Sequence, residues 1–459
     1  MRSLFEILRR IAMDLLSKYD VIVAGGGPAG ICAAIAAGRE GASTVLIERY
    51  GFLGGMSTAA LVYPWMTFHT MKGEQVIKGI AQEIVDRLVE RGESPGHLRD
   101  TVGFTHTLTP FQPEAFKLLA LEMLREANVT LLLHSFIDNV HVENDNITAI
   151  EVTGKSGRIK ISGKVFIDCT GDADLVALSG APFQKGRAED GLTQPMTLKF
   201  RLRNVDVDQI KAYMIENPDE FVDSTPIAEL PHLPLTGVAG FNSIWQQGKL
   251  SINRQNFLFF IGPEPDEVLV NSTRVQGLDP TNIEHLSEAE EIGRKQVLEL
   301  LHYMKAHLPG FNNAVLSHTG TQIGVRESRR LEGLYSLTME DVVSARPFPD
   351  AIAHSGYPID VHAPTGSGII SAWPDGGGAY DIPYRCLVSS KIHNLLAAGR
   401  CISTTHEALG TTRLTPSCMA TGEAAGVAAT LAAQGNKPVK DIDVNELRNK
   451  LRTSGAYLK

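Results

Sequence analysis

Short apolar runs alternate with helical stretches in the N-terminal part of the chain, a pattern typical of a parallel sheet covered by helices. Residues 19–24 and 44–48 are apolar and rich in β-branched side chains, so each predicts a buried parallel strand. The Ala-rich segment 28–41 between them predicts a helix packed beneath a sheet. The three segments form one βαβ unit with an expected right-handed crossover, and we therefore predict a doubly wound α/β fold.

Further periodic segments extend this predicted sheet. An amphipathic helix with Pro113 near its start leads into a strand at 130–134. Two alternating runs, 147–154 and 157–163, are separated by a short turn and predict a hairpin. The chain then returns to the sheet with 164–174, so the hairpin is an excursion from the βαβ core.

The pattern changes in the middle of the chain and returns near its C-terminus. After a region richer in Pro and aromatic residues, 393–400 predicts a buried strand and 414–435 a helix, with Thr415 and Pro416 suited to its cap and first turn. The first domain is therefore expected to be discontinuous, with an α+β substrate domain inserted into it. The predicted division is an N-terminal helical extension (1–18), a first domain in two parts (19–182 and 384–440), the inserted domain (183–383) and a C-terminal tail (441–459).

The first eighteen residues carry an apolar helical stripe with three arginines, which leaves two interpretations open. One is an extra N-terminal helix, or an upstream start with Met13 as the true first residue. The other is a membrane-surface anchor. A secretory signal is not expected, because the stretch has no uninterrupted apolar core and no small-residue cleavage site.

Composition and charge narrow the class of protein. The chain has 459 residues, with 43 Lys+Arg against 52 Asp+Glu, and its net charge of −9 argues against a nucleic-acid partner. No apolar run reaches the roughly 20 residues of a membrane-spanning helix. Five scattered cysteines without a C-x-x-C pair indicate neither a disulfide framework nor a zinc cluster. We expect a cytoplasmic, globular protein that acts on a small molecule and holds no metal; its oligomeric state stays open, a homo-oligomer included.

A glycine-rich turn supplies the clearest chemical motif. Gly25, Gly27 and Gly30 form G-x-G-x-x-G directly after a predicted strand and at the start of a predicted helix. Such a turn exposes backbone amides to a pyrophosphate at the helix N-terminus. Glu48 ends the second strand, where a carboxylate accepts hydrogen bonds from a ribose diol and repels a 2′-phosphate. The motif predicts a dinucleotide site for NAD or FAD and disfavours NADP.

Several widely separated motifs, in the same order, resemble one family over roughly residues 19 to 435. They are AGGGPAG, Glu48, GFLGGMS, FIDCTGDAD, GVRESRR, AAGRCIS and TPSCMATGEAAG. They are similar to those of FAD-dependent oxidoreductases with the glutathione-reductase-type flavin-binding fold, relatives of the fumarate reductase and succinate dehydrogenase flavoproteins. The resemblance implies FAD as cofactor and a discontinuous Rossmann-type domain.

The resemblance also implies a set of cofactor-binding positions. They are Gly25, Gly27, Pro28, Ala29, Gly30, Glu48, Arg49, Gly54, Gly55, Met56, Phe136, Thr170, Gly171, Asp172, Gly399, Arg400, Thr415 and Cys418. Asp172 is expected to accept hydrogen bonds from the ribityl chain, and the helix starting at Thr415 to point its N-terminus at the flavin. Met56 stands where related disulfide reductases have a redox cysteine, which argues against dithiol chemistry. No second G-x-G-x-x-G follows, so no separate nicotinamide domain is expected.

Candidates for substrate chemistry are fewer. The run 357–362 predicts a strand with Asp360 and His362 on one face, and His362 is the candidate general acid or base, ahead of His69, His354 and His406. Arg413 is a candidate to supply a positive charge that stabilises the reduced flavin or an anionic substrate. Arg326 belongs to GVRESRRLEG, which we interpret as an internal salt-bridge cluster, with anion recognition as the alternative.

These features favour a flavoenzyme that moves a hydride between flavin N5 and a substrate carbon next to oxygen or nitrogen. Reduction of an activated C=C bond in a carboxylate substrate is the alternative, with Arg413 or Arg326 as the carboxylate clamp. A flavin-binding protein without catalytic activity is a third hypothesis.

Overall fold

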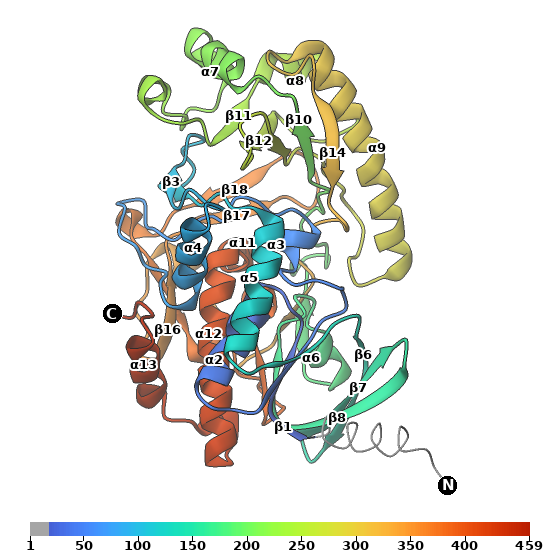
Figure 1. Cartoon of the computed structure of the whole chain (residues 1–459), viewed down its shortest axis with the longest axis vertical. Helices are drawn as coiled ribbons and strands as arrows, with labels where there is room; N and C mark the ends of the chain where they lie inside the picture. Colours follow the sequence, from blue (N-terminus) through green and yellow to red (C-terminus); the bar gives the residue numbers. More distant parts are fainter. Residues whose placement is uncertain (1–17) are drawn as a thin grey trace.

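A seven-stranded sheet forms the main layer of the computed structural model, which describes residues 18–459 (Figure 1). Its strands are β1 (Lys18–Ala24), β2 (Thr44–Ile47), β5 (Thr130–Leu132), β6 (Phe136–Glu143), β7 (Asn146–Gly154), β8 (Gly157–Asp168) and β20 (Leu395–Ala397). The order is β5-β2-β1-β8-β7-β6, with β20 also paired to β8. Strands β5, β2, β1, β8 and β20 run parallel, which confirms the predicted parallel α/β sheet.

Two helices from opposite ends of the chain cover one face of this sheet. Helix α2 (Pro28–Arg39) follows β1, and α12 (Thr415–Gly435) lies beside it (Figure 1). A Cβ added at Gly422 of α12 would lie 2.1 Å from the carbonyl oxygen of Ala29. This close backbone approach requires glycine and holds the C-terminal helix against the helix that follows the glycine turn.

The hairpin excursion is confirmed, but its second strand is longer than predicted. Strand β8 pairs with β7 in its first half and with β1 in its second half, so the hairpin strand and the returning strand are one element. Strand β6 was not predicted. Its pairing with β7 is interrupted by register shifts between Ile137 and Asn139 and between His141 and Val142. Such bulges break the alternation of apolar and polar side chains by which a strand is recognised in a sequence.

A second sheet lies apart from the first, in the upper part of Figure 1. Its order is β11-β12-β13-β10-β14, all neighbours are antiparallel, and helix α9 (Ile283–His307) packs with it. Its other elements are β10 (Phe200–Arg203), α7 (Val207–Glu216), β11 (Gly237–Gly240), α8 (Asn242–Gln247), β12 (Phe257–Ile261), β13 (Val268–Val270) and β14 (Val315–Thr319). Its buried core spans 196–325. Within the predicted 183–383 domain, residues 337–382 pack instead into the core of the first sheet.

The remaining elements connect or cover the two sheets. They are α3 (Met56–Ala59), α4 (Ile80–Glu90), β3 (Leu98–Arg99), β4 (Thr107–Leu108), α5 (Pro113–Glu126), α6 (Asp174–Leu178), β9 (Phe183–Lys185), β15 (Arg329–Leu331), α10 (Met339–Val343), β16 (Ala351–Ser355), β17 (Ile359–His362), β18 (Ile369–Ala372), β19 (Tyr380–Pro383), α11 (His406–Thr412) and α13 (Val444–Thr453). The predicted N-terminal helix, apart from Lys18, lies outside the described residues. Among the helices of residues 18–459, none has both the length and the apolar character needed to cross a membrane.

Candidate functional site

A cavity of about 430 Å³ lies where the carboxyl ends of the parallel strands face the five-stranded sheet. Its wall includes Gly25 after β1, Glu48 after β2 and Thr170 after β8. The second sheet contributes Lys199 and Leu258. In open α/β folds, ligands bind outside the carboxyl ends of the strands, so this cavity is the candidate site.

The glycine turn at one end of the cavity is fixed by Glu48. The Gly26 amide donates to Glu48 Oε2 at 2.7 Å, and the Tyr50 amide donates to Oε1 at 2.8 Å. Burial raises the pKa of Glu48, and these two backbone donors oppose the rise. Gly30 packs beneath the turn, since a Cβ there would lie 1.8 Å from the Gly25 carbonyl oxygen. The Glu48 carboxylate and the glycine turn before α2 are therefore held next to one another in the cavity wall.

Most of the predicted cofactor positions line this cavity. Those that line it are Gly25, Gly27, Pro28, Ala29, Glu48, Arg49, Gly55, Met56, Thr170, Gly171, Gly399, Arg400, Thr415 and Cys418. Gly30, Gly54, Phe136 and Asp172 do not line it. The Gly54 amide donates instead to the Gly26 carbonyl at 2.9 Å, and Phe136 begins strand β6 with 55% of its surface exposed.

Asp172 acts on the cavity through Arg400. Its Oδ1 accepts hydrogen bonds from Ser328 Oγ at 2.7 Å and from Arg400 Nη2 at 2.9 Å. Burial raises the pKa of Asp172, but the Arg400 and Arg49 charges and the Ser328 hydrogen bond together outweigh burial, and the net shift is downward. This carboxylate therefore orients the Arg400 guanidinium, which lines the cavity, whereas Asp172 does not line the cavity as the sequence predicts.

The long helix α12 begins at the cavity. Its N-cap is Leu414, with no side-chain cap, and Thr415 and Pro416 are its first two residues. The expectation that Thr415 caps the helix is therefore wrong, whereas Pro416 does occupy the first turn. Because Leu414 and Thr415 line the cavity, the positive end of the helix dipole faces it. Cys418, one turn later, has a thiol whose pKa burial raises to about 12, so it is a protonated thiol.

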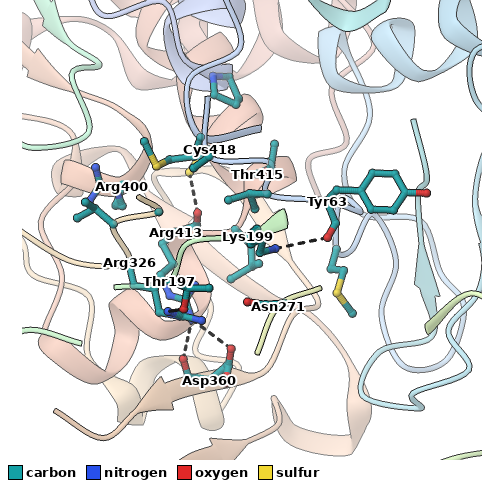
Figure 2. A pocket seen from close by; sticks show the side chains of 18 of the residues that line it. Tyr63, Thr197, Lys199, Asn271, Arg326, Asp360, Arg400, Arg413, Thr415 and Cys418 are labelled. Carbon is teal, nitrogen blue, oxygen red and sulfur yellow. Dashed lines mark hydrogen bonds and ion pairs between the residues drawn. The ribbon is translucent and has the colours of Figure 1, made fainter. Parts of the chain in front are cut away.

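Three polar residues that include two catalytic candidates, Arg413, Asp360 and His362, lie together in the wall of the cavity. Arg413 directly follows α11, and its Nη2 donates to Asp360 Oδ2 at 3.1 Å and to the Asp360 carbonyl at 3.0 Å (Figure 2). His362, two residues along β17, has Nε2 3.5 Å from the same Oδ2. As predicted, Asp360 and His362 share a face, and both line the cavity. Burial, and then the Arg326 charge, lower the pKa of His362 to about 3, which does not suit the general acid or base role expected from the sequence.

The arginine-rich segment 324–330 divides into two parts. Arg329 pairs with Asp174, and the buried Arg330 pairs with Glu327, as the salt-bridge interpretation expects. Arg326 instead lines the cavity, where its Nη1 donates to the Pro195 carbonyl at 2.7 Å and to Thr197 Oγ1 at 2.6 Å. For Arg326, the anion-recognition alternative fits the geometry better.

The sequence motifs did not identify the polar residues that flank the strands of the second sheet. Lys199, Arg254 and Asn271 all line the cavity, and Figure 2 shows Lys199 between Tyr63 and the Arg326 and Arg413 side chains. Burial lowers the pKa of Lys199 to about 7. The sequence does contain a signal for Lys199. In the run 196–200, apolar residues alternate with Thr197 and Lys199, so a strand here would place the lysine on the face opposite the apolar side chains, in a segment that is buried.

The residues fit an FAD molecule. The glycine turn and the Glu48 carboxylate form one end of the cavity wall, and the start of α12 lies farther along it. Among residues 18–459, the buried atoms Arg400 Nη1 and Arg413 Nε have no hydrogen-bond partner. Both guanidinium groups line the cavity, so a bound group with acceptor oxygens would satisfy them.

Comparisons with known proteins agree with this geometry. Ferredoxin–NADP reductase of Streptococcus agalactiae is 39% identical over 75 residues, which is 16% of this chain and 22% of that protein. Ferredoxin–NADP reductase 2 of Listeria welshimeri is 36% identical over 80 residues, 17% of this chain and 23% of that protein. The matched segment thus spans less than a quarter of these curated relatives.

A solved structure extends the similarity to the whole fold. The p-nitrophenol 4-monooxygenase of Pseudomonas putida superposes with a TM-score of 0.50 and 12% identity, covering 96% of this chain and 87% of that chain. At this identity the likeness shows the fold alone. The model of the family described as FAD dependent oxidoreductase matches residues 20–451. This chain therefore belongs to the FAD-dependent oxidoreductases, and its cofactor is FAD.

Proposed function

We propose that the enzyme transfers a hydride between flavin N5 and a small polar organic substrate, at a C–H bond next to oxygen or nitrogen. One observation carries the proposal: a single cavity joins the glycine turn and the start of α12 to polar side chains of the second sheet. Bound FAD supplies the hydride-accepting ring. The side chains on the far wall bind and orient the substrate against it.

The cofactor end of the cavity has three functions in this proposal. The glycine turn and the N-terminus of α2 hold the pyrophosphate, and Glu48 accepts hydrogen bonds from the ribose diol. The N-terminus of α12, at Thr415, stabilises negative charge on the reduced flavin. Arg400, oriented by Asp172, contributes a fixed positive charge to the same region.

The substrate end holds Arg413, Arg326 and His362. Arg413 is held by Asp360, and Arg326 is held by Thr197 and the Pro195 carbonyl. Both guanidinium groups are therefore ordered before the substrate binds, and binding does not lose side-chain entropy at these positions. His362 is uncharged at neutral pH. We therefore assign His362 to hydrogen bonding rather than to proton transfer, in place of the general acid or base role expected from the sequence.

A second candidate reaction is the reduction of an activated C=C bond in a carboxylate substrate. The observation in its favour is that Arg326, Arg413 and Lys199 converge on one cavity (Figure 2). The arginines would bind the substrate carboxylate. A protonated Lys199 would give its proton to the carbon of the C=C bond that does not receive the hydride. This reaction also agrees with the motif resemblance to the fumarate reductase flavoproteins.

Anaerobic mixing distinguishes the two reactions. The purified yellow protein is mixed with hydroxy acids, amines, sugars and polyols, and bleaching of the oxidised-flavin band is followed. The proposal expects at least one of these donors to bleach the flavin. If no donor does so, while dithionite-reduced enzyme is reoxidised by unsaturated acids, the second candidate replaces the first. A colourless protein that binds NAD alone would contradict both.

A further inference from the structure

We infer that the part of the cavity beside the five-stranded sheet is an anion site, formed by Lys199, Arg254 and Arg326, that binds a carboxylate group of the substrate. The inference rests on the proposed function and deepens it, because it names the chemical class of the substrate. It holds for either direction of hydride transfer, since both an oxidised and a reduced organic acid carry the carboxylate.

Lys199 is the first observation behind this site. The side chain is buried, and its Nζ makes one hydrogen bond, of 3.4 Å, to the Tyr63 carbonyl. Among residues 18–459 no carboxylate lies within ion-pair distance of this amine. A buried ammonium group with a single weak acceptor is costly unless an anion completes its coordination. Because Lys199 lines the cavity, such an anion would come from a bound molecule.

The charge balance of this region is the second observation. Four cationic side chains line it, namely Lys199, Arg254, Arg326 and Arg413. The carboxylate among the lining residues at this end is Asp360, and Arg413 already engages it at 3.1 Å. The excess of positive charge is local, because the chain as a whole carries a net charge of −9. Like charges held together in a desolvated pocket are stabilised by a ligand of opposite charge.

The polar contacts of the arginines leave donors for such a ligand. Arg254 Nη1 donates to the Asn271 carbonyl at 3.0 Å, and Arg326 Nη1 is held by Thr197. Each guanidinium has further N–H groups, and the planar fork matches the two oxygens of a carboxylate. The Asn271 side-chain oxygen is buried without a partner among residues 18–459, so it can accept a hydrogen bond from a hydroxyl or amino group beside that carboxylate.

A carboxylate fits this position better than a larger anion for a geometric reason. The reacting carbon must lie beside the flavin, within the same cavity of about 430 Å³ that holds the cations. A carboxylate bonded to that carbon, or one carbon away, places the charge and the reacting bond within the span of one small molecule. The pyrophosphate of bound FAD would be held by the turn at Gly25 and Gly27, and would not neutralise these cations.

Binding of malonate to the FAD-loaded protein tests the site without turnover. Malonate and its uncharged analogue malonamide are titrated by calorimetry, with the shift of the flavin absorption band as a second readout. We expect malonate to bind and malonamide not to bind. Equal binding of the two compounds, or binding of inorganic phosphate without binding of malonate, would overturn the inference. This comparison uses the unaltered chain and does not depend on the folding of a variant.

Substitutions then locate the site. We expect Lys199→Met and Arg326→Gln each to weaken malonate binding at least tenfold, with the flavin content of each variant measured in parallel. Lys295→Met is the matched control, because Lys295 lies on α9 with 72% of its side chain exposed, and it should bind malonate as the unaltered chain does. Unchanged malonate affinity in both cavity variants would overturn the assignment.

These experiments distinguish a failure of the anion site from a failure of the proposed reaction. If neutral alcohols or amines bleach the flavin and malonate does not compete with them, the oxidoreductase function stands and the anion site is wrong. If malonate binds through Lys199 and Arg326 but no donor or acceptor changes the flavin, the anion site stands and the proposed reaction is wrong.

Discussion

The carboxylate of Asp360 lies 3.1 Å from Nη2 of Arg413 and 3.5 Å from Nε2 of His362, so one acid contacts both a permanent cation and a neutral ring. Burial alone would raise the pKa of Asp360, but these neighbours hold it far below its usual range. Burial, and then the Arg326 charge, keep a proton off His362, because a second cation in this desolvated position is unfavourable. The charge states of Asp360, Arg413 and His362 are therefore fixed at neutral pH.

We expect His362→Asn to leave the pH dependence of flavin reduction unchanged between about pH 5 and 8. The pKa of His362 is about 3, so the ring is neutral throughout this range and has no proton to lose. The measurement is the rate of anaerobic flavin bleaching against pH in stopped flow. His232→Asn, an exposed position, is the control. An inflection near pH 6.5 that disappears only in His362→Asn would contradict the assignment.

Glu48→Gln should weaken FAD binding about 10- to 100-fold. The carboxylate fixes the glycine turn through the Gly26 and Tyr50 amides, and hydrogen bonds to a charged group contribute about 1.5–3 kcal/mol. A glutamine side chain provides one acceptor oxygen in place of two. Titration of the apoprotein with FAD, followed by flavin fluorescence, gives the dissociation constant. The exposed Glu143→Gln should bind FAD as the unaltered chain does, and equal affinities for all three proteins would contradict the role of Glu48.

The affinity for malonate should fall as the pH rises through about 7. Burial, together with the charges of Arg326, Arg413 and Arg254, lowers the pKa of Lys199 to about 7, so Lys199 is protonated below this pH and neutral above it. The pKa of Arg254 is about 10, so that group stays charged at neutral pH. Calorimetry from about pH 6 to about pH 9 measures the change. The trend should be absent in Lys199→Met, and a parallel decline in that variant would assign the titration to another group.

Local motifs allowed the cofactor end to be predicted from the sequence, whereas the substrate end depends on tertiary contacts. Gly25, Gly27 and Glu48 lie in one βαβ unit, so their spacing along the chain already determines their proximity in space. Lys199 and Arg254 reach the cavity through the packing of an antiparallel sheet, and no short motif encodes that arrangement. Asp172 shows an intermediate case, since its motif was recognised but its partner Arg400 lies more than two hundred residues away.

Glu423 provides a prediction about stability, independent of the active site. Its side chain is buried on α12, and Oε2 accepts a hydrogen bond of 2.9 Å from the Ile80 amide at the start of α4. Burial raises the pKa of Glu423 from 4.5 to about 7. The folded chain thus holds a proton that the unfolded chain has released, and the associated stability is present below about pH 4.5 and lost as the pH rises through about 7.

Replacing Glu423 by Gln removes this pH dependence while keeping an acceptor for the Ile80 amide. Between about pH 4.5 and 7.5, the free energy of unfolding of the unaltered chain should fall by about 3 kcal/mol relative to Glu423→Gln, since one pKa unit corresponds to about 1.4 kcal/mol. Urea denaturation at several pH values measures the difference. Glu114→Gln, at a side chain that is 75% exposed, should follow the unaltered chain. Parallel curves for Glu423→Gln and the unaltered chain would mean that Glu423 does not carry a raised pKa in the folded state.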